Sequence, residues 1–315
     1  MKHFITLRDL PDFKETVTLA KSLKKDPFAF ETQGKRKTLG LLFFNPSLRT
    51  RLSTQKAAHN LGCNTLVMNF SNEAWALEFE DGTEMRGIRS EHVREAAAVV
   101  SQYCDMVAIR AFASLSNKEQ DEADVVLSSF AKYADIPVIN MESAVGHPLQ
   151  ALADALTLSE HPTPHRPKVV LTWAPHPKAL PHAVGNSFTH MMQFQEADYV
   201  IANPEGYDLN PKITKNIPVI HNQEEALQNA DFVYAKNWCS YSQYGQILRT
   251  DDAWQLTEEK MALTNNAKFM HCLPVRRNIV VADGVLDHPN SLVIEQANNR
   301  TYAAQAVLKT ILDYA

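Results

Sequence analysis

Three short motifs bring hydroxyl, guanidinium, imidazole and amide groups to places where strands are predicted to end. The first is SLRTR at residues 47–51, between the apolar run at 38–44 and a helix-like pattern. Its hydroxyl groups, its two guanidiniums and the free amide donors of a helix start suit an oxyanion. Taken alone, the same five residues also fit an ordinary N-cap serine followed by surface arginines.

The other two motifs occupy the same kind of position farther along the chain. HPLQ at 147–150 follows the predicted strand at 137–141, and HCLP at 271–274 ends another strand-like run. Arg110 is the last residue of a predicted strand as well. Because sites in open parallel sheets lie at the carboxyl ends of strands, this repetition favours a shared site.

Each of these residues also has a simpler structural interpretation. Arg110 fits an ion pair at a sheet end, His147 fits a helix N-cap, and Cys272 fits a small buried side chain. His176 follows the strand-like run at 169–173 within a proline-rich turn, which by itself favours a structural role. Trp75 lies among acidic residues, which favours a loop over the core.

Composition limits the function classes. The chain has 315 residues, 45% of them hydrophobic, which is enough for two domains with substantial cores. Lys and Arg total 31 against 36 Asp and Glu, and no basic block stands out, so nucleic acid is not expected as a partner. The acidic residues form no ligand cluster, and we expect no metal and no cofactor.

The cysteines and the apolar segments predict the compartment. The four cysteines show neither CxxC pairing nor zinc spacing and indicate free thiols in a reducing compartment. The first residues lack the apolar segment of a signal peptide, and the longest apolar runs are strand-sized. We therefore expect a soluble cytoplasmic protein with no membrane partner.

Short β-rich runs alternate with amphipathic stretches, which predicts an α/β fold of two parallel-sheet domains covered by helices. The first domain is expected over 1–146 together with the C-terminal helix 299–315, and the second over 147–298. The predicted strands are 38–44, 65–68, 106–110, 137–141, 169–173, 199–202, 218–220, 232–235 and 268–271. One predicted helix follows the first strand and ends near Leu61, and the others cover 92–100, 118–133, 147–161 and 299–314.

SLRTR, Arg110, HPLQ and HCLP, in this order, resemble the aspartate/ornithine transcarbamylase family over essentially the whole chain. The resemblance implies two parallel α/β domains, with carbamoyl phosphate held mainly by the first and the amino substrate by the second. It also implies a homotrimer with sites between neighbouring subunits.

By position, the resemblance assigns roles to individual residues. The phosphate contacts would be Ser47, Leu48, Arg49, Thr50 and Arg300, whereas Arg51 receives no binding role. The carbamoyl group would contact Arg110, His147, Gln150 and the backbone carbonyls of Cys272 and Leu273, with Pro148 and Leu149 completing the HPLQ segment. Arg49, Thr50, Arg110, His147, Gln150 and Cys272 would thus be the catalytic residues, with either the leaving phosphate or the Cys272 thiol accepting the amine proton.

Departures from the ornithine enzymes are equally informative. The Ser-Met-Gly segment that holds a free α-amino acid is absent, and residues 235–240 read AKNWCS. HCLP is followed by VRRN instead of Arg-Gly. These features resemble the branch that carbamoylates N-acylated ornithine in arginine biosynthesis, in which a tryptophan at the place of Trp75 reaches the neighbouring subunit's site. The acyl-ornithine contacts of that branch resemble Glu142, His176, Lys236 and Arg276.

The electrostatics of the substrate agree with this branch. An acylated α-nitrogen is neutral, so it needs no anionic partner, whereas the α-carboxylate still needs cations such as Lys236 and Arg276. A succinyl group adds a second carboxylate and increases the need for positive charge.

Ser90 bears on the identity of the acyl group. In this branch the residue before the Glu-His pair is Glu in the acetyl enzymes and Pro in the succinyl enzymes, and this chain has Ser90 there. A glutamate about 4 Å from the succinyl carboxylate would repel it by about 4 kcal/mol at an effective dielectric constant of about 20. Ser90 removes that repulsion, so N-succinylornithine is the expected substrate and N-acetylornithine the alternative. Ser90 also fits a helix N-cap before His92.

Two functions from other classes are disfavoured. A dinucleotide-binding protein would need GxGxxG after a strand, and the chain has ten glycines and no such run. A non-catalytic relative that kept only the fold would have lost the phosphate arginines, and these are present.

Overall fold

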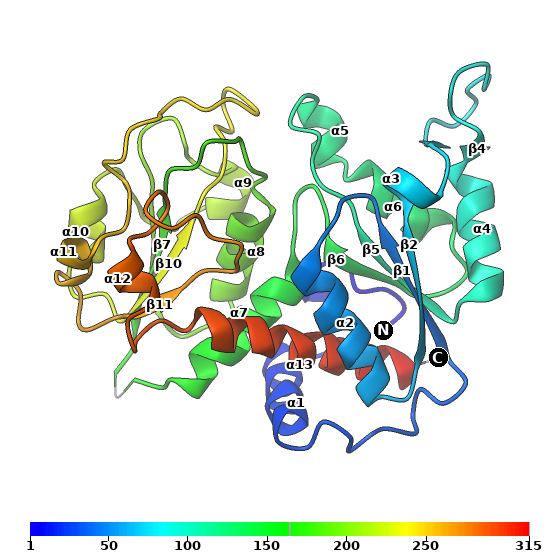
Figure 1. Cartoon of the computed structure of the whole chain (residues 1–315), viewed down its shortest axis with the longest axis horizontal. Coiled ribbons are helices and arrows are strands. Elements are labelled where there is room, and N and C mark those ends of the chain that lie inside the picture. Colours follow the sequence, from blue (N-terminus) through cyan, green and yellow to red (C-terminus); the bar gives the residue numbers. More distant parts are fainter. Residues whose placement is uncertain (164, 315) are drawn as a thin grey trace. The chain divides into compact units, whose positions relative to one another are not determined.

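The apolar run that begins at Thr38 forms an inner strand of a parallel sheet (Figure 1). In the computed structural model, which describes residues 1–163 and 165–314, this sheet has the order β2-β1-β5-β6. Side chains on both faces of β1 and β5 are buried, as expected of a parallel sheet with helices on both sides. The strands are β1 Thr38–Phe43, β2 Asn64–Asn69, β5 Met106–Arg110 and β6 Val138–Glu142.

The chain folds into two compact units. Unit 1 comprises Met1–Leu156 together with the segment from Asn299 onward, and unit 2 comprises Thr157–Asn298. The division expected after residue 146 falls at the start of α7 (Pro148–Glu160), whereas the units separate within that helix.

Helices cover the sheet of unit 1 on both faces. On one face Val93, Ala97 and Phe130 of α4 and α6 pack against Val107 and Ile109 of β5 in a single apolar cluster. The helices are η1 Leu7–Asp9, α1 Phe13–Lys25, α2 Leu48–Asn60, α3 Phe70–Glu73, α4 Val93–Tyr103, α5 Lys118–Glu122, α6 Val125–Tyr133 and the unit 1 part of α13 Val293–Leu312.

The C-terminal helix α13 packs within unit 1. Tyr302 and Ala306 lie in one buried cluster with Leu23 of α1. The Asn60 amide donates to Gln305 Oε1 at 3.0 Å and so ties α13 to the end of α2. These contacts fix the helix that carries Arg300.

Unit 2 repeats the architecture with a five-stranded parallel sheet of order β11-β10-β7-β8-β9. Figure 1 shows α8 on one side of this sheet and α10, α11 and α12 on the other. The strands are β7 Lys168–Trp173, β8 Asp198–Ala202, β9 Val219–Ile220, β10 Phe232–Lys236 and β11 Lys268–Met270; the helices are α8 Ala183–Met192, α9 Pro211–Thr214, α10 Gln223–Leu227, α11 Glu258–Met261 and α12 Asp283–Leu286.

The expected α/β fold of two parallel-sheet domains is confirmed, and three local predictions were wrong. The helix predicted at 118–133 is two helices, because Asp124 adopts a left-handed conformation (φ 52°) and its carboxylate accepts from the Ala144 amide. The helix predicted from Asn299 begins at Val293. Ser90 is not the N-cap of α4: His92 is, and its ring nitrogen accepts from the Arg94 amide at 3.1 Å.

None of the helices in the described part of the chain is both long enough and apolar enough to span a membrane.

Candidate functional site

The SLRTR motif forms the start of α2 directly after β1. Ser47 is the N-cap, and its hydroxyl accepts from the Thr50 amide at 3.3 Å. The simpler N-cap interpretation of this serine is thus correct, and the Thr50 amide is not one of the free donors. Leu48 is exposed and Thr50 is buried, so the motif points both outward and into unit 1.

Arg300 joins three of the predicted residues in a buried network. Its Nη1 donates to Gln150 Oε1 at 2.8 Å, and its Nη2 donates to Thr50 Oγ1 at 2.6 Å. The same Nη2 lies 3.4 Å from His147 Nε2. Residues from α2, α7 and α13, up to 250 positions apart in sequence, therefore meet at one point.

Arg110 provides a second buried guanidinium in unit 1. Its Nε donates to Glu142 Oε2 at 3.2 Å, and its Nη1 donates to the carbonyl oxygens of Asn45 and Pro46. Glu142 Oε2 also lies 3.5 Å from His147 Nε2, which links this pair to the Arg300 network. Arg110 thus forms an ion pair at the end of the sheet, as the simpler interpretation predicts. Through Glu142 it also lies beside His147, another residue predicted to contact the carbamoyl group.

His147 is neutral in this environment. Burial, reinforced by the guanidiniums of Arg300 and Arg110, holds the pKa of His147 well below the usual histidine value. A neutral imidazole donates one N–H and carries no net charge. The positive charge of the cluster therefore comes from the arginines.

Asp154 is a site residue that the sequence reasoning missed. It is fully buried on α7, one helical turn after Gln150, and its Oδ1 accepts from Gln150 Nε2 at 2.7 Å. This bond fixes which way the Gln150 amide faces, so that its oxygen points to Arg300. The available signal was a carboxylate at i+4 from Gln150 within the apolar part of the helix, residues 151–156.

In unit 2 the HCLP motif forms the turn that follows β11. Cys272 is buried, as the simpler interpretation expects. Leu273 has φ 54°, a left-handed conformation that is uncommon for a leucine. The turn is held by His271, whose Nδ1 accepts from the Leu273 amide at 2.9 Å, and the His271 amide in turn donates to Gln296 at 2.9 Å.

Three basic side chains of unit 2 lie near one another. Arg276 Nε donates to His176 Nε2 at 3.1 Å, and Lys236 is close enough to influence the pKa of His176. Burial lowers that pKa, and the charges of Lys236, Arg276 and Lys178 lower it further. The hydrogen bond to the Lys178 carbonyl raises the pKa and offsets part of this effect. Since a neutral His176 accepts from Arg276, it orients that guanidinium.

Reciprocal hydrogen bonds lock the two strand ends that carry His176 and Lys236. The Asn237 amide donates to the Ala174 carbonyl at 2.7 Å, and Trp173 Nε1 donates to the Trp238 carbonyl at 2.8 Å. The backbone amide of Ala174 donates to the Lys236 carbonyl at 3.2 Å. The basic groups therefore project from a rigid edge of the sheet.

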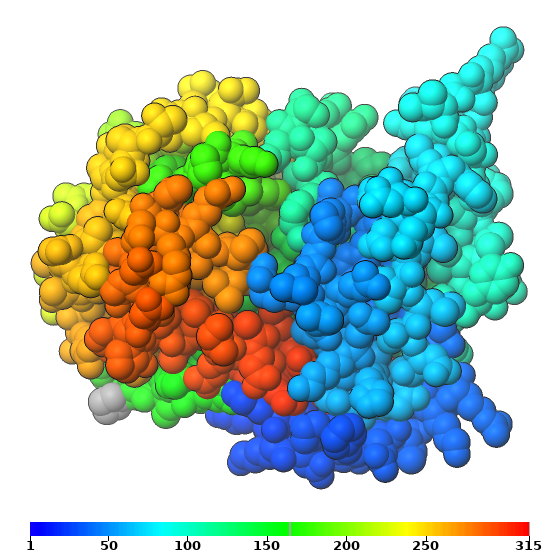
Figure 2. All heavy atoms as spheres, in the orientation of Figure 1, coloured from blue at the N-terminus to red at the C-terminus, as the bar shows by residue number. Residues whose placement is uncertain are grey.

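Trp75 and Ser90 lie on the segment that joins α3 to α4. This segment contains the two short paired strands β3 Leu77–Glu78 and β4 Glu91–His92, and the loop between them projects from the surface of unit 1 (Figure 2). The Trp75 side chain is 58% exposed, and its indole donates to Glu91 at 2.7 Å.

The base of the loop is anchored by carboxylates. Buried Glu78 accepts from Arg89 at 2.6 Å, and Asp81 accepts from the hydroxyl of Tyr133 at 2.7 Å and from Lys132 at 3.0 Å. These bonds lower the pKa of Asp81 to about 2, with the Tyr133 hydrogen bond as the largest cause. These bonds tie the base of the loop to α6.

The structure thus brings Thr50, His147, Gln150 and Arg300 together in unit 1, with Arg110 and Glu142 beside them. In unit 2 it brings His176, Lys236 and Arg276 together. Within the described residues there is no group of three or more His, Cys, Asp or Glu side chains that could hold a metal ion.

Known proteins with the same domains identify this arrangement. The carbamoyl-P binding domain of aspartate/ornithine carbamoyltransferases matches residues 2–160, and the Asp/Orn binding domain of the same enzymes matches residues 182–311. The chain belongs to the aspartate/ornithine carbamoyltransferase family. Thr50, His147 and Gln150, which contact Arg300, lie within the match to the carbamoyl-P binding domain. Lys236 and Arg276 lie within the match to the Asp/Orn binding domain.

Relatives within this carbamoyltransferase family are similar over the full chain. An N-succinylornithine carbamoyltransferase of Bacteroides fragilis (strain 638R) is 48% identical, with 99% of each chain covered. An N-acetylornithine carbamoyltransferase of Xanthomonas campestris pv. campestris is 37% identical over 99% of this chain and 98% of its own. A crystal structure of a glutamate-to-serine variant of N-acetyl-L-ornithine transcarbamylase, complexed with carbamyl phosphate and N-succinyl-L-norvaline, has a TM-score of 0.92 at 36% identity and covers 99% of this chain and 100% of its own.

Proposed function

We propose that this carbamoyltransferase transfers the carbamoyl group of carbamoyl phosphate to the δ-amine of N-succinyl-L-ornithine, giving N-succinyl-L-citrulline and phosphate in arginine biosynthesis. The observation that carries the proposal is the meeting of Arg300 with Thr50, Gln150 and His147 in unit 1. Such a set of donors and cations suits a phosphorylated carbamate.

The residues of unit 1 divide between the phosphate and the carbamoyl oxygen. Arg49, Arg300 and the start of α2 with Ser47, Leu48 and Thr50 hold the phosphate through charge-assisted hydrogen bonds. Thr50, Arg110 and His147 stabilise the tetrahedral oxyanion that forms when the amine attacks the carbamoyl carbon. Gln150, within the His147-Pro148-Leu149-Gln150 segment, and the Cys272 and Leu273 carbonyls orient the carbamoyl NH₂ group.

The chemical step is a direct displacement without a covalent enzyme intermediate. The neutral δ-amine forms the new C–N bond, the C–O bond to phosphate breaks, and the amine proton leaves with the phosphate, which is the stronger candidate acceptor. The lowered pKa of His147 supports its role as a neutral hydrogen-bond donor and not as the base.

The choice of a succinyl substrate rests on charge. N-succinylornithine carries two carboxylates, and the basic group of His176, Lys236 and Arg276 in unit 2 suits such a ligand. Glu142 is the fourth residue assigned to the acyl-ornithine. Ser90 stands where the acetyl enzymes carry glutamate. We take that glutamate to be the one replaced by serine in the related transcarbamylase variant that holds N-succinyl-L-norvaline.

The working unit is proposed to be a cytoplasmic homotrimer. The exposed indole of Trp75, on the segment that joins α3 to α4, supports a role in the carbamoyl phosphate site of the neighbouring subunit, with Ser90 of the same segment facing the acyl group there. Each site would then need two subunits.

Parallel assays with N-succinyl-, N-acetyl- and free ornithine at a fixed carbamoyl phosphate concentration test the proposal. The expected kcat/KM is highest for the succinyl substrate and lowest for free ornithine, because free ornithine brings an ammonium into a basic group. A higher kcat/KM for N-acetylornithine would instead assign the alternative substrate, and no phosphate release with any of the three would refute carbamoyl transfer.

A further inference from the structure

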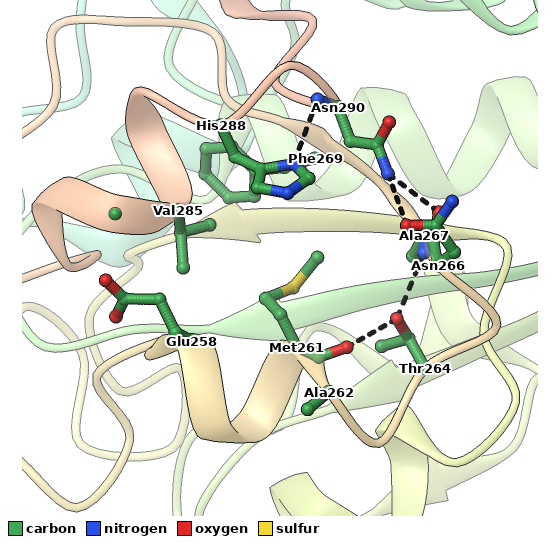
Figure 3. A pocket seen from close by; sticks show the side chains of 11 residues that line it. Glu258, Met261, Ala262, Thr264, Asn266, Ala267, Phe269, Val285, His288 and Asn290 are labelled. Atoms are coloured by element: carbon green, nitrogen blue, oxygen red, sulfur yellow. Dashed lines mark hydrogen bonds between the residues drawn. The ribbon is translucent and has the colours of Figure 1, made fainter.

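A cavity in unit 2 is lined by none of the residues assigned to carbamoyl transfer. It has a volume of about 440 Å³ and lies between α11, α12 and the strand β11 (Figure 3). Cavities of a few hundred Å³ with apolar walls and a few polar groups are typical of small-ligand sites. Here Met261, Phe269 and Val285 supply the apolar surface, and Figure 3 shows the Met261 side chain reaching into the middle of the space.

Glu258 places a carboxylate at one side of this cavity. Within the described part of the chain the Glu258 carboxylate has neither a hydrogen-bond nor an ion-pair partner. It lies directly over α12, because a Cβ built at Gly284 would stand 1.6 Å from Glu258 Oε1. Only a glycine at 284 leaves room for the carboxylate in this position. An ionised carboxylate is an acceptor only, and its favoured partners are ammonium and guanidinium groups.

His288 supplies a second polar group on the wall. Its Nδ1 accepts from the Asn290 amide at 3.1 Å, so in the neutral ring the proton is on Nε2. Glu258 and His288 thus add a carboxylate acceptor and an N–H donor to the apolar surface, and Thr264, Asn266 and Asn290 complete the polar part of the wall.

We propose that this cavity binds a small aliphatic ammonium or guanidinium compound, with its cation on Glu258 and its carbon chain against Met261, Val285 and Phe269. The carboxylate selects the charge, and the three apolar side chains select a hydrocarbon chain over a bare cation. An inorganic cation would leave the apolar surface uncovered.

The site is coupled to Arg276 through α12. Gly284 and Val285 of α12 line the cavity, and Asp283 at its start accepts from Arg277 Nη1 at 2.8 Å. Asp287 directly after α12 accepts from Arg277 Nη1 at 2.9 Å and Nη2 at 2.6 Å. Arg277 adjoins Arg276. A ligand that fixes α12 thus favours one position of Arg276 and lowers the KM for the acyl substrate, a step that rests on the proposed function.

Titration of the full-length protein with 1-butylguanidinium tests binding without any enzyme assay. Calorimetry is expected to give saturable binding to the wild type, binding about tenfold weaker to Glu258→Gln, and unchanged binding to the matched control Glu259→Gln, whose side chain is not part of the cavity. Butan-1-ol has the same carbon chain without the charge, and it should bind to the wild type at least as weakly as 1-butylguanidinium binds to Glu258→Gln. Equal binding to the wild type and Glu258→Gln, or no saturable binding to the wild type, would overturn the proposal.

The coupling is measured separately. At saturating 1-butylguanidinium the KM for N-succinylornithine is expected to fall about fivefold with little change in kcat, and Arg277→Gln is expected to lose that change while still binding the probe. An unchanged KM in the wild type would overturn the coupling. If the protein binds the probe but transfers no carbamoyl group, the proposed function is refuted. The ligand class proposed for the cavity is then still supported.

Discussion

Replacing Arg300 with glutamine should separate anion binding from folding. Arg300 is 6% exposed and donates to Gln150 and Thr50 at 2.8 and 2.6 Å. Truncating one partner of a buried, hydrogen-bonded charge pair costs about 2–5 kcal/mol. If carbamoyl phosphate is the group that pairs with Arg300, kcat/KM for carbamoyl phosphate should fall about 30-fold to several thousandfold.

The same substitution should affect stability much less. The substitution removes the donor to Thr50 Oγ1 and to Gln150 Oε1. The Thr50 hydroxyl keeps its own O–H, so the main cost is the Gln150 oxygen left without this donor, about 1–3 kcal/mol. Removing a buried charge offsets part of that cost.

The assay follows phosphate release while carbamoyl phosphate is varied, and urea unfolding at the same pH reports stability. Arg166→Gln is the matched control, since Arg166 pairs with Asp198 on the exposed surface of unit 2. If Arg300→Gln lost activity only in proportion to its loss of folded protein, or kept a normal KM for carbamoyl phosphate, the assignment of Arg300 to the phosphate would be refuted.

Three further predictions concern the acyl group, the pH dependence of stability and the neighbouring subunit. Ser90→Glu should lower the succinyl-to-acetyl ratio of kcat/KM by up to about a thousandfold, whereas Ser90→Ala should leave the ratio near the wild-type value; an unchanged ratio in Ser90→Glu would remove Ser90 as the selector. Because the pKa of His147 is depressed in the folded protein, its contribution to stability is complete above the unfolded value of about 6.5 and is lost as pH falls below it, by about 1.4 kcal/mol per pH unit. Urea unfolding from pH 7 to 5 should therefore show a shallower pH dependence in His147→Asn than in the wild type; equal slopes in the two proteins would contradict a neutral, buried His147. Trp75→Ala and Arg300→Gln should each be nearly inactive alone, yet regain up to about one third of wild-type activity when co-assembled, because a hybrid trimer holds one complete site; failure to regain activity in verified hybrids would contradict the exchange of Trp75 between subunits.

The sequence predicts the inner strands of the sheets well because these strands are buried on both faces. Runs such as residues 106–110 and 169–173 are continuously buried and mostly apolar, and only a parallel sheet covered by helices buries both faces of such runs. The short helices α11 and α12 have four residues each, which is too few for a periodic pattern to register. The cavity between them was therefore invisible in the sequence.

The site was predictable to the extent that strand ends define it. Arg110 ends β5, and Thr50 and His147 lie on the segments that follow β1 and β6 of the same parallel sheet. The carboxyl ends of such strands share an edge. Asp154 was missed, because an apolar helix does not reveal which of its few polar residues points to the site. The N-cap role considered for Ser90 failed because His92 pairs in β4 and caps α4 itself.

Transfer of label from [¹³C]carbamoyl phosphate tests the central claim most directly. When the purified protein is mixed with labelled carbamoyl phosphate and N-succinyl-L-ornithine, carbon NMR should show the label in the ureido carbon of N-succinyl-L-citrulline, with phosphate formed in equal amount. Label that stays in carbamoyl phosphate and its spontaneous breakdown products, or that appears only when free ornithine is supplied, would contradict the account.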